Sequence, residues 1–308
     1  MKRAVLAVAL LLLVTPALEP TSSHAQGEIV RIAAAGDIAC DPYSDPNFNQ
    51  TLGANGYCHM RQTSDLLLSG SYDAVLALGD NQYENGAHDK YLASFDPTWG
   101  RIKSLIRPVA GNHNHRVVDA QGYRDYFGSA AVNGAGKTYY SYNLGDWHLI
   151  ALDSNCKKVG GCSSSSGQAQ WLKSDLAAHS NFQCTLAYFH HPRFASDQSG
   201  TPQGAFWNIL YNAKADVILN GHVHRYERFA PQQPNGSLDA TNGIAEFIVG
   251  TGGKNLNNKV LSPRTNSVAN QATDYGVLEM TLQPGAYEFR FVPEAGGSYS
   301  DSGSHQCH

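Results

Sequence analysis

The sequence predicts an α/β fold built around mixed β-structure. Short runs of apolar and β-branched residues recur along the chain and alternate with helix-like or loop segments, which is typical of an α/β architecture. Gly145-Asp146 and Pro284-Gly285 are turn signals that each separate two neighbouring β-rich runs, so we expect two hairpins and a mixed sheet. No internal repeat is present, and residues 26–308 are expected to form a single domain.

The individual elements follow from local composition. Ten segments rich in β-prone residues predict strands: 29–35, 74–78, 107–110, 139–144, 148–152, 185–189, 217–219, 245–249, 276–282 and 287–292. Segments 168–178 and 206–213 predict helices, because their apolar residues recur at helical spacing. We expect both helices to cover a sheet face.

The N-terminal segment has the layout of a secretory signal peptide. Lys2 and Arg3 precede the apolar run 4–14, and small residues allow cleavage after Ala25. A helix that spans a bilayer needs about 20 apolar residues, and Pro16 interrupts the run too early. We therefore expect residues 1–25 to be removed and the protein to be secreted, either to a periplasm or outside the cell, without membrane insertion.

The charge of the chain limits the classes of partner it can bind, and its cysteine content indicates the redox state of its compartment. The formal net charge is −4, and no basic run could neutralise a phosphate backbone, so nucleic acid is not an expected partner. The six cysteines form an even set without a CxxC pair, which favours disulfides over a thiolate metal site in an exported protein. Six cysteines allow 15 pairings. Proximity in sequence favours Cys40–Cys58 and Cys156–Cys162, which leaves Cys184 for Cys307.

Five short polar clusters each follow a strand-like run. They are GDIAC at 36–40, GDNQY at 79–83, GNHN at 111–114, FHHP at 189–192 and NGHVH at 220–224. Binding groups converge at the carboxyl ends of strands in an open sheet, so these clusters are expected to meet in one crevice. They supply carboxylate, phenol, amide and imidazole groups, a set that suits iron, zinc or manganese. Two such ions could hold a hydroxide nucleophile and support in-line displacement at phosphorus.

In order along the chain, these clusters resemble the GD, GD, GNH, H and GHxH signature of the calcineurin-like metallophosphoesterases. The GDxxY form at Tyr83 and the stretch NGHVHRYER at 220–228 are similar to purple acid phosphatases. The resemblance covers most of residues 26–308. It implies a four-layer α/β sandwich with two mixed β-sheets flanked by helices, in the short, catalytic-domain-only form of the family.

The resemblance also implies two ligand sets for two metal ions. The first ion, ferric iron, would be held by Asp37, Asp80, Tyr83 and His224. The second, divalent ion would be zinc, iron or manganese and would be held by Asp80, Asn112, His190 and His222. Asp80 would bridge the two ions.

His113 matches the family's histidine beside the asparagine ligand, and we expect it to protonate the leaving oxygen or to bind the phosphoryl group. Asn114 stands where the family usually has an acidic residue, which predicts a change in the orientation and charge of His113. His191 and His115 are further candidates for substrate contact, and Arg193 is a candidate partner for a phosphate oxygen.

Several polar residues have a simpler interpretation. A GD dipeptide alone is as often a turn as a ligand, and an isolated histidine is more often a structural residue than a metal ligand. Six histidines outside the clusters are therefore given no site role: His59, His88, His148, His179, His305 and His308. The tail around Cys307 is expected to be a mobile end tied down by one disulfide.

Three functions are compatible with the sequence. The leading hypothesis is a secreted, acid phosphatase-like hydrolase of small phosphate monoesters, in which a metal-bound hydroxide attacks in line. A phosphodiesterase with the same metal site and a more open pocket is the nearest alternative. The third is a non-catalytic phosphate- or metal-binding protein. Intact His113 and the full ligand set argue against the third. The sequence leaves the oligomeric state open.

Overall fold

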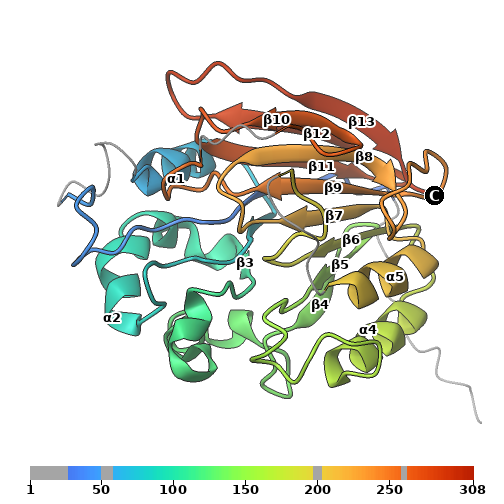
Figure 1. Cartoon of the computed structure of the whole chain (residues 1–308), viewed down its shortest axis with the longest axis horizontal. Coiled ribbons are helices and arrows are strands. Elements are labelled where there is room, and N and C mark those ends of the chain that lie inside the picture. Colours follow the sequence, from blue (N-terminus) through green and yellow to red (C-terminus); the bar gives the residue numbers. More distant parts are fainter. Residues whose placement is uncertain (1–26, 50–57, 197–202, 258–261) are drawn as a thin grey trace, which may run out of the picture.

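Two β-sheets pack face to face, with helices on their outer sides (Figure 1). The structure is a computed structural model that describes residues 27–49, 58–196, 203–257 and 262–308. The segment predicted to be a signal peptide lies outside these residues. The arrangement confirms the predicted four-layer α/β sandwich.

The first sheet has six strands in the order β13-β12-β11-β1-β2-β3. They are β1 (Val30–Ala35), β2 (Ala74–Ala77), β3 (Ile106–Pro108), β11 (Gly276–Gln283), β12 (Ala286–Pro293) and β13 (Ser302–Gln306). β1, β2 and β3 are parallel, whereas β11 to β13 pair antiparallel. Ile32 of β1 lies opposite Ala74 of β2 and Met280 of β11. The carboxyl ends of β1, β2 and β3 therefore open onto the same edge.

The second sheet has seven strands in the order β10-β8-β9-β7-β6-β5-β4. They are β4 (Tyr140–Leu144), β5 (Trp147–Ala151), β6 (Cys184–Tyr188), β7 (Val217–Asn220), β8 (Tyr226–Gln232), β9 (Ile244–Val249) and β10 (Ser267–Gln271). The four central strands β5, β6, β7 and β9 are parallel. β4, β8 and β10 add to them antiparallel, so this sheet is also mixed.

The helices lie on the outer sides of the sheets. They are α1 (Met60–Ser69), α2 (His88–Lys90), α3 (Gln121–Phe127), α4 (Gly167–Ala178) and α5 (Gly204–Asn212). Shorter helical turns occupy Tyr91–Phe95, Trp99–Leu105, Asn114–Arg116, Val118–Ala120 and Gly128–Ala131. Ser166 caps α4, because its side chain accepts a hydrogen bond from the backbone N–H of Ala169.

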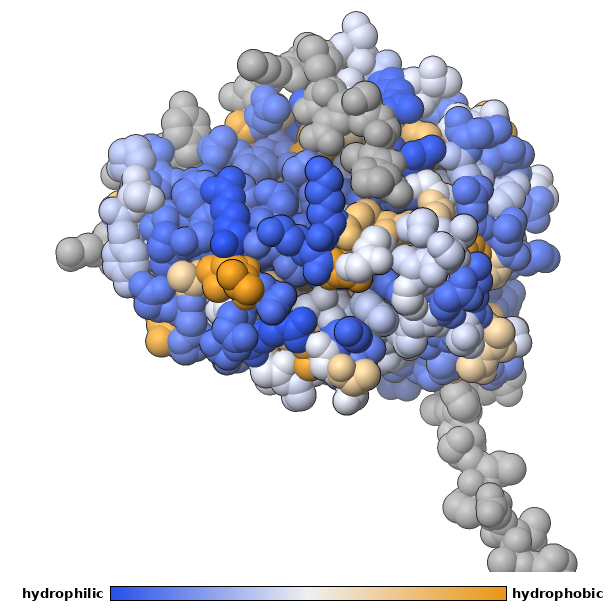
Figure 2. Space-filling model, turned by 60° about the horizontal axis from the view of Figure 1, so that its bottom comes forward, coloured by the Kyte–Doolittle hydropathy of each residue, from blue (hydrophilic) through white to orange (hydrophobic). Residues whose placement is uncertain are grey.

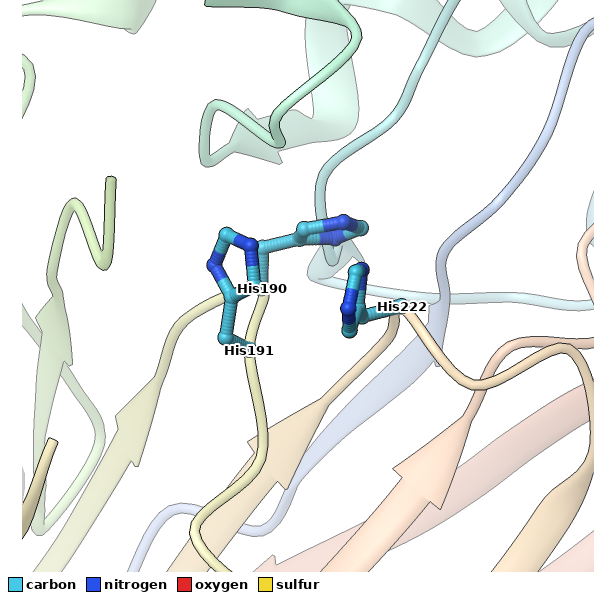
Figure 3. Close-up of side chains that lie close together, drawn as sticks. All are labelled: His190, His191 and His222. Atoms are coloured by element: carbon cyan, nitrogen blue, oxygen red, sulfur yellow. The ribbon is translucent and has the colours of Figure 1, made fainter. Parts of the chain in front are cut away.

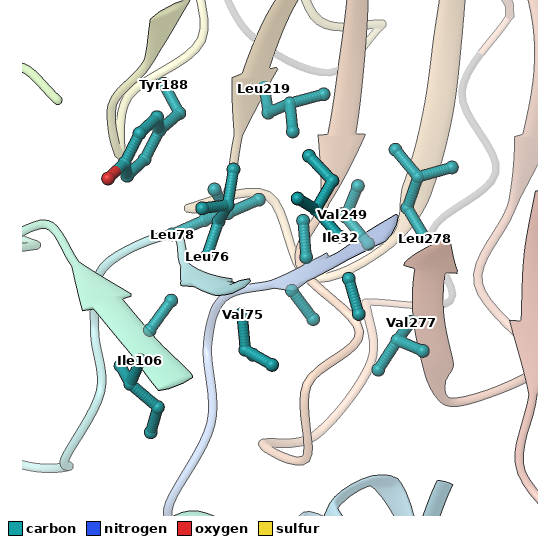
Figure 4. Packing of buried hydrophobic residues seen from close by; sticks show 14 of the residues in the cluster. Ile32, Val75, Leu76, Leu78, Ile106, Tyr188, Leu219, Val249, Val277 and Leu278 are labelled. Atoms are coloured by element: carbon teal, nitrogen blue, oxygen red, sulfur yellow. The ribbon is translucent and has the colours of Figure 1, made fainter. Parts of the chain in front are cut away.

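The main hydrophobic core lies between the two sheets. Ile32, Leu76 and Leu278 of the first sheet pack near Leu219 and Val249 of the second, and all five are fully buried (Figure 4). Burying one such side chain stabilises the fold by about 1.5–3 kcal/mol. This packing holds the carboxyl ends of the two parallel strand sets close together.

A second core lies between the other face of the second sheet and the helices α4 and α5. Ile150 and Ile218 project from the sheet, and Leu172, Phe206 and Leu210 meet them from the helices. This packing confirms the two predicted helices and their position on a sheet face.

All ten predicted strands are present, with ends within two residues of the prediction. Both predicted hairpins are also present, because β4 pairs antiparallel with β5 and β11 with β12. Three strands were not predicted, namely β8, β10 and β13. They are polar or interrupted segments that pair through their backbones near the sheet edges. The expectation of a mobile tail was therefore wrong, because β13 forms an edge strand.

The three predicted cysteine pairs are all present as disulfides: Cys40–Cys58, Cys156–Cys162 and Cys184–Cys307. Hydrophilic side chains cover most of the face seen in Figure 2. Among the described segments, no helix combines the length and apolarity needed to cross a bilayer.

Candidate metal centre

The five polar clusters meet at one edge of the sandwich. Each of five predicted ligands lies shortly after a parallel strand: Asp37 after β1, Asp80 after β2, Asn112 after β3, His190 after β6 and His222 after β7. Three of these strands belong to the first sheet and two to the second. The site therefore forms where the carboxyl ends of strands from both sheets face one another.

Four predicted ligands, called here the first group, gather around the Tyr83 hydroxyl: Asp37, Asp80, Tyr83 and His224. The Tyr83 hydroxyl lies 2.8 Å from Asp37 Oδ1, 3.2 Å from Asp80 Oδ2 and 2.9 Å from His224 Nε2. His224 Nε2 is also 3.3 Å from Asp37 Oδ1. Oxygen and nitrogen atoms of four side chains thus converge on a small volume.

The second group contains Asp80, Asn112, His190 and His222. His190 Nε2 lies 3.2 Å from Asp80 Oδ2 and 3.2 Å from Asn112 Oδ1. The His222 ring stands nearly perpendicular to the His190 ring, with centroids 5.0 Å apart. Figure 3 shows that the rings of His190, His191 and His222 lie close together. The first two belong to the loop after β6 and the third to the loop after β7. Asp80 belongs to both groups, because the same carboxylate oxygen faces Tyr83 and His190.

The backbone is strained at three of these ligands. Asp37, Asp80 and His222 have φ values of 59°, 45° and 71°, a left-handed conformation that costs non-glycine residues about 1–3 kcal/mol each. Gly79, with φ 88°, precedes Asp80, and a Cβ atom there would lie 2.5 Å from the Nδ1 atom of His190. Such strain is concentrated at functional sites, and here it turns the ligands off their strands toward the centre.

Backbone carbonyl groups orient two of the histidines. The Nδ1 atom of His190 lies 2.9 Å from the Leu78 carbonyl oxygen, and that of His224 lies 2.6 Å from the Asn255 carbonyl oxygen. When each Nδ1–H donates to its carbonyl, each Nε2 lone pair faces the centre. This arrangement is typical of histidines that bind metal.

The centre concentrates charge in a buried space. Burial would raise the pKa values of Asp37 and Asp80, but the neighbouring histidines outweigh it and hold both below the usual range. Burial opposes a charge on His190, yet Asp80 and Asp37 outweigh it and raise the pKa of His190 to about 9. Burial and the proximity of His190 lower the pKa of His222 to about 4.

These residues fit bound cations. Two buried carboxylates need a positive partner, because an unpaired buried charge is costly. Without metal, a proton on His190 fulfils part of this requirement. The carboxylate and imidazole donors suit iron, zinc or manganese. Tyr83 adds a third oxygen-bearing side chain to the first group; burial and the carboxylates of Asp37 and Asp80 raise the pKa of its hydroxyl, so a bound cation would be needed to ionise it.

His113 lies beside the two groups and is positioned by Glu84. Its Nδ1 atom lies 2.6 Å from the Glu84 carbonyl oxygen, and its Nε2 atom lies 3.9 Å from Asp80 Oδ2. Asn114 is fully buried, accepts a hydrogen bond from the Gly111 N–H and donates one to the Tyr91 hydroxyl. Asn114 therefore stabilises its own loop through these hydrogen bonds, whereas the backbone carbonyl group of Glu84 contacts the His113 ring. Sequence reasoning missed Glu84, although it directly follows Tyr83.

The other substrate-contact candidates occupy different places. His191 lies next to the second group, with its ring centroid 4.4 Å from that of His222, and its Nδ1 atom is 2.8 Å from the Ser154 hydroxyl. His115 is 5% exposed, and its Nε2 atom lies 2.8 Å from Asp153 Oδ2.

Arg193 contacts other parts of the fold. Its backbone N–H donates to Glu246, and its guanidinium lies against Gly204 at the start of α5. Ser154 was also missed, because an isolated serine after a strand carries no sequence signal for its contact with His191.

Comparison with known proteins identifies relatives of this chain. The family model described as calcineurin-like phosphoesterase matches residues 30–226. Purple acid phosphatase 15 of Arabidopsis thaliana is 27% identical over 260 residues, which cover 72% of this chain and 45% of that protein. Purple acid phosphatase 22 of the same plant is 26% identical, covering 60% of this chain and 45% of that protein. The chain thus spans about half the length of these curated relatives.

A solved structure shares the fold. The purple acid phosphatase PPD1 from yellow lupin seeds (Lupinus luteus) superposes with a TM-score of 0.69 at 18% identity, over 91% of this chain and 54% of that one. This likeness supports the two-sheet architecture. From the family model over 30–226, together with the convergence of the five motif clusters, we conclude that the chain belongs to the calcineurin-like phosphoesterase family.

Proposed function

We propose that this protein is a secreted phosphatase that hydrolyses small phosphate monoesters at a binuclear metal centre. The observation that carries the proposal is the pair of ligand groups joined by Asp80. Ligand atoms of Asp37, Asp80 and His190 lie within 4.8 Å of one another, which links the two groups. A single structural ion would not need seven convergent donors around a shared carboxylate.

The first group would hold a ferric ion and the second a divalent ion of zinc, iron or manganese. Two bound cations would supply a nucleophile near neutral pH and neutralise charge on the phosphoryl group. The chain's own residues would position the ions, and Asp80 would contact both. The similarity of GDxxY to purple acid phosphatases supports Tyr83 as the residue that selects ferric iron.

His113 is the proposed proton donor to the leaving oxygen. Its Nδ1–H is directed toward the Glu84 carbonyl oxygen, which leaves Nε2 as the atom that would carry the transferred proton. Arg116 Nη2 donates to this Nε2 atom at 3.2 Å, so Arg116 would turn to the anionic phosphoryl group when Nε2 takes up the proton. His191 would contact substrate from the side of the second group.

The three disulfides and the signal-like N-terminal sequence support export. We propose small phosphorylated molecules as the only substrates and no nucleic-acid partner. A monoester preference follows from the similarity to purple acid phosphatases.

The first experiment is purification without chelators, followed by elemental analysis, a visible spectrum and parallel assays on an aryl phosphate monoester and diester. We expect two metals per chain, a purple or pink colour from the Tyr83 phenolate bound to ferric iron, and faster monoester turnover. A colourless protein with two zinc or manganese ions would still support a metal-dependent hydrolase, but it would rule out the proposed ferric site. Faster diester turnover would reject the monoester preference.

A pair of variants tests the ligand assignment directly. Asp80→Ala should lose both metals and all activity, because it removes the shared carboxylate. His88→Ala is the matched control, since this exposed histidine on α2 lies outside both groups. Two metals retained in Asp80→Ala would contradict the assignment.

A further inference from the structure

A basic cavity is lined by residues that follow two segments of the candidate site closely in sequence. It has a volume of about 570 Å³ and is formed by three loops that approach from different parts of the chain. These loops contribute His115 and Asp119, Lys137 and Tyr139, and Lys158 with Gly160. None of the residues assigned to either ligand group lines this cavity, so it is a separate feature of the structure.

The cavity carries positive charge in an acidic protein. Arg124, Lys137 and Lys158 line it, and Asp119 is its single acidic lining residue, whereas the whole chain has a formal net charge of −4. Lys137 and Lys158 are exposed, and neither ammonium group forms an ion pair with any residue in the described ranges. The two lysines are therefore available to an anion from solution.

The walls of the cavity are held in place. Arg124 donates from Nε to the Asp119 carbonyl oxygen and from Nη1 to the Gly136 carbonyl oxygen, both at 2.7 Å, so it joins two of the three loops. The third loop is closed by the Cys156–Cys162 disulfide, and the Lys158 backbone N–H donates to Asn155 at 2.7 Å.

The backbone is strained in the wall of the cavity that contains Asp119. Asp119 and Ala120 are consecutive non-glycine residues with φ values of 53° and 51°. A left-handed conformation at two such residues in a row costs about 1–3 kcal/mol each and is maintained only by the surrounding structure. The cavity and the candidate metal centre thus share this feature of functional sites.

Two short connections tie the cavity to the metal centre. His115 follows the predicted ligand Asn112 by three residues, which limits their Cα separation to about 11 Å. Ser154, whose hydroxyl contacts His191, precedes Lys158 by four residues, which limits that separation to about 14 Å. The side chains of Lys137 and Lys158 reach several ångströms further. These limits put lining residues of the cavity within the length of a small molecule from Asn112 and Ser154.

We propose that this cavity is a second anion subsite, and that the preferred substrates are phosphate esters whose leaving group carries another phosphate. This inference rests on the proposed phosphatase function. The ester phosphate would lie at the metal centre, and the second phosphate would be bound by Lys137 and Lys158 near the face of Arg124. Charge-assisted hydrogen bonds to the second phosphate would then raise affinity for bisphosphates over matched monophosphates.

The kinetic test compares fructose 1,6-bisphosphate with fructose 6-phosphate in the metal-loaded protein. The double variant Lys137→Glu/Lys158→Glu should lower the ratio of kcat/KM for the bisphosphate over the monophosphate by at least about tenfold, mainly through KM. Lys157→Glu is the matched control, because this exposed neighbour lies on the same loop but does not line the cavity. An unchanged ratio in the double variant, or an equal change in Lys157→Glu, would overturn the subsite.

A binding test separates the subsite from the proposed catalysis. Fructose 1,6-bisphosphate is titrated calorimetrically into the metal-free chain at low and at high salt. The subsite predicts binding that weakens at least about tenfold in the double variant and weakens with salt, because the contacts are exposed charges. If the bisphosphate binds in a salt-sensitive way but the metal-loaded protein hydrolyses no phosphoester, the proposed phosphatase function is wrong and the anion subsite stands. If the metal-loaded protein hydrolyses phosphoesters but bisphosphate binding does not depend on Lys137 and Lys158, the anion subsite is wrong and the phosphatase function stands.

Discussion

Glu246 on β9 is a fully buried carboxyl group that should make the stability of this protein depend on pH. Its Oε1 atom accepts hydrogen bonds from the backbone N–H groups of Arg193, at 2.9 Å, and Phe194, at 3.4 Å. These two residues lie in the loop that follows His190. Burial raises the pKa of Glu246 to about 8, and Glu227 acts in the same direction.

The sign and size of the effect follow from this pKa. Between pH 4.5, the ordinary value for glutamate, and about 8, the folded protein keeps a proton on Glu246 that the unfolded chain releases. The free energy of unfolding therefore falls as pH rises through this window. A tenfold step in proton concentration corresponds to about 1.4 kcal/mol, so the loss between pH 5 and 8.5 amounts to about 4 kcal/mol.

The Glu246→Gln variant isolates this effect. Its amide oxygen can still accept the hydrogen bonds from the Arg193 loop, but it does not titrate. Urea unfolding of both metal-free proteins from pH 5 to 8.5, followed by tryptophan fluorescence, should show the variant gaining about 4 kcal/mol relative to the native protein as pH rises. Glu288→Gln on the exposed face of β12 is the control and should shift stability by less than about 0.5 kcal/mol at every pH. A constant gap between native protein and Glu246→Gln would refute the reasoning.

Three further perturbations test the site and the fold. Gly79→Ala places a Cβ atom 2.5 Å from the ring of a predicted ligand histidine, so it should lower the metal content measured by elemental analysis and destabilise the fold by more than about 1 kcal/mol. Gly134→Ala, where a Cβ would meet open space, should do neither, and equal effects would contradict the steric argument. Tyr83→Phe should abolish the visible colour while far-ultraviolet circular dichroism stays native; retained colour would exclude Tyr83 as its source. Replacing Cys184 and Cys307 by serine opens a loop of sequence separation 123 and should reduce the free energy of unfolding in urea by about 3–5 kcal/mol, whereas an unchanged midpoint would show that the bridge adds no stability.

Local sequence was sufficient to predict most of the central fold. β-prone apolar runs identified every strand of the two parallel sets, and turn residues identified both hairpins, because these signals act within a few residues of one another. The edge strands were missed for the opposite reason. β13 has the sequence SGSHQ, and it becomes a strand only because β12 offers it a row of backbone partners.

The sequence by itself determined which residue types supply the candidate centre, since glycine before an aspartate or histidine at the end of a strand is a local pattern with a steric cause. Only the tertiary structure decided that Asp80 faces both Tyr83 and His190, that Glu84 rather than Asn114 contacts His113, and that Lys137 and Lys158 share a cavity. Each of these contacts depends on which loops two packed sheets bring to the same edge. No pattern of neighbouring residues encodes a distance between loops that are tens of positions apart.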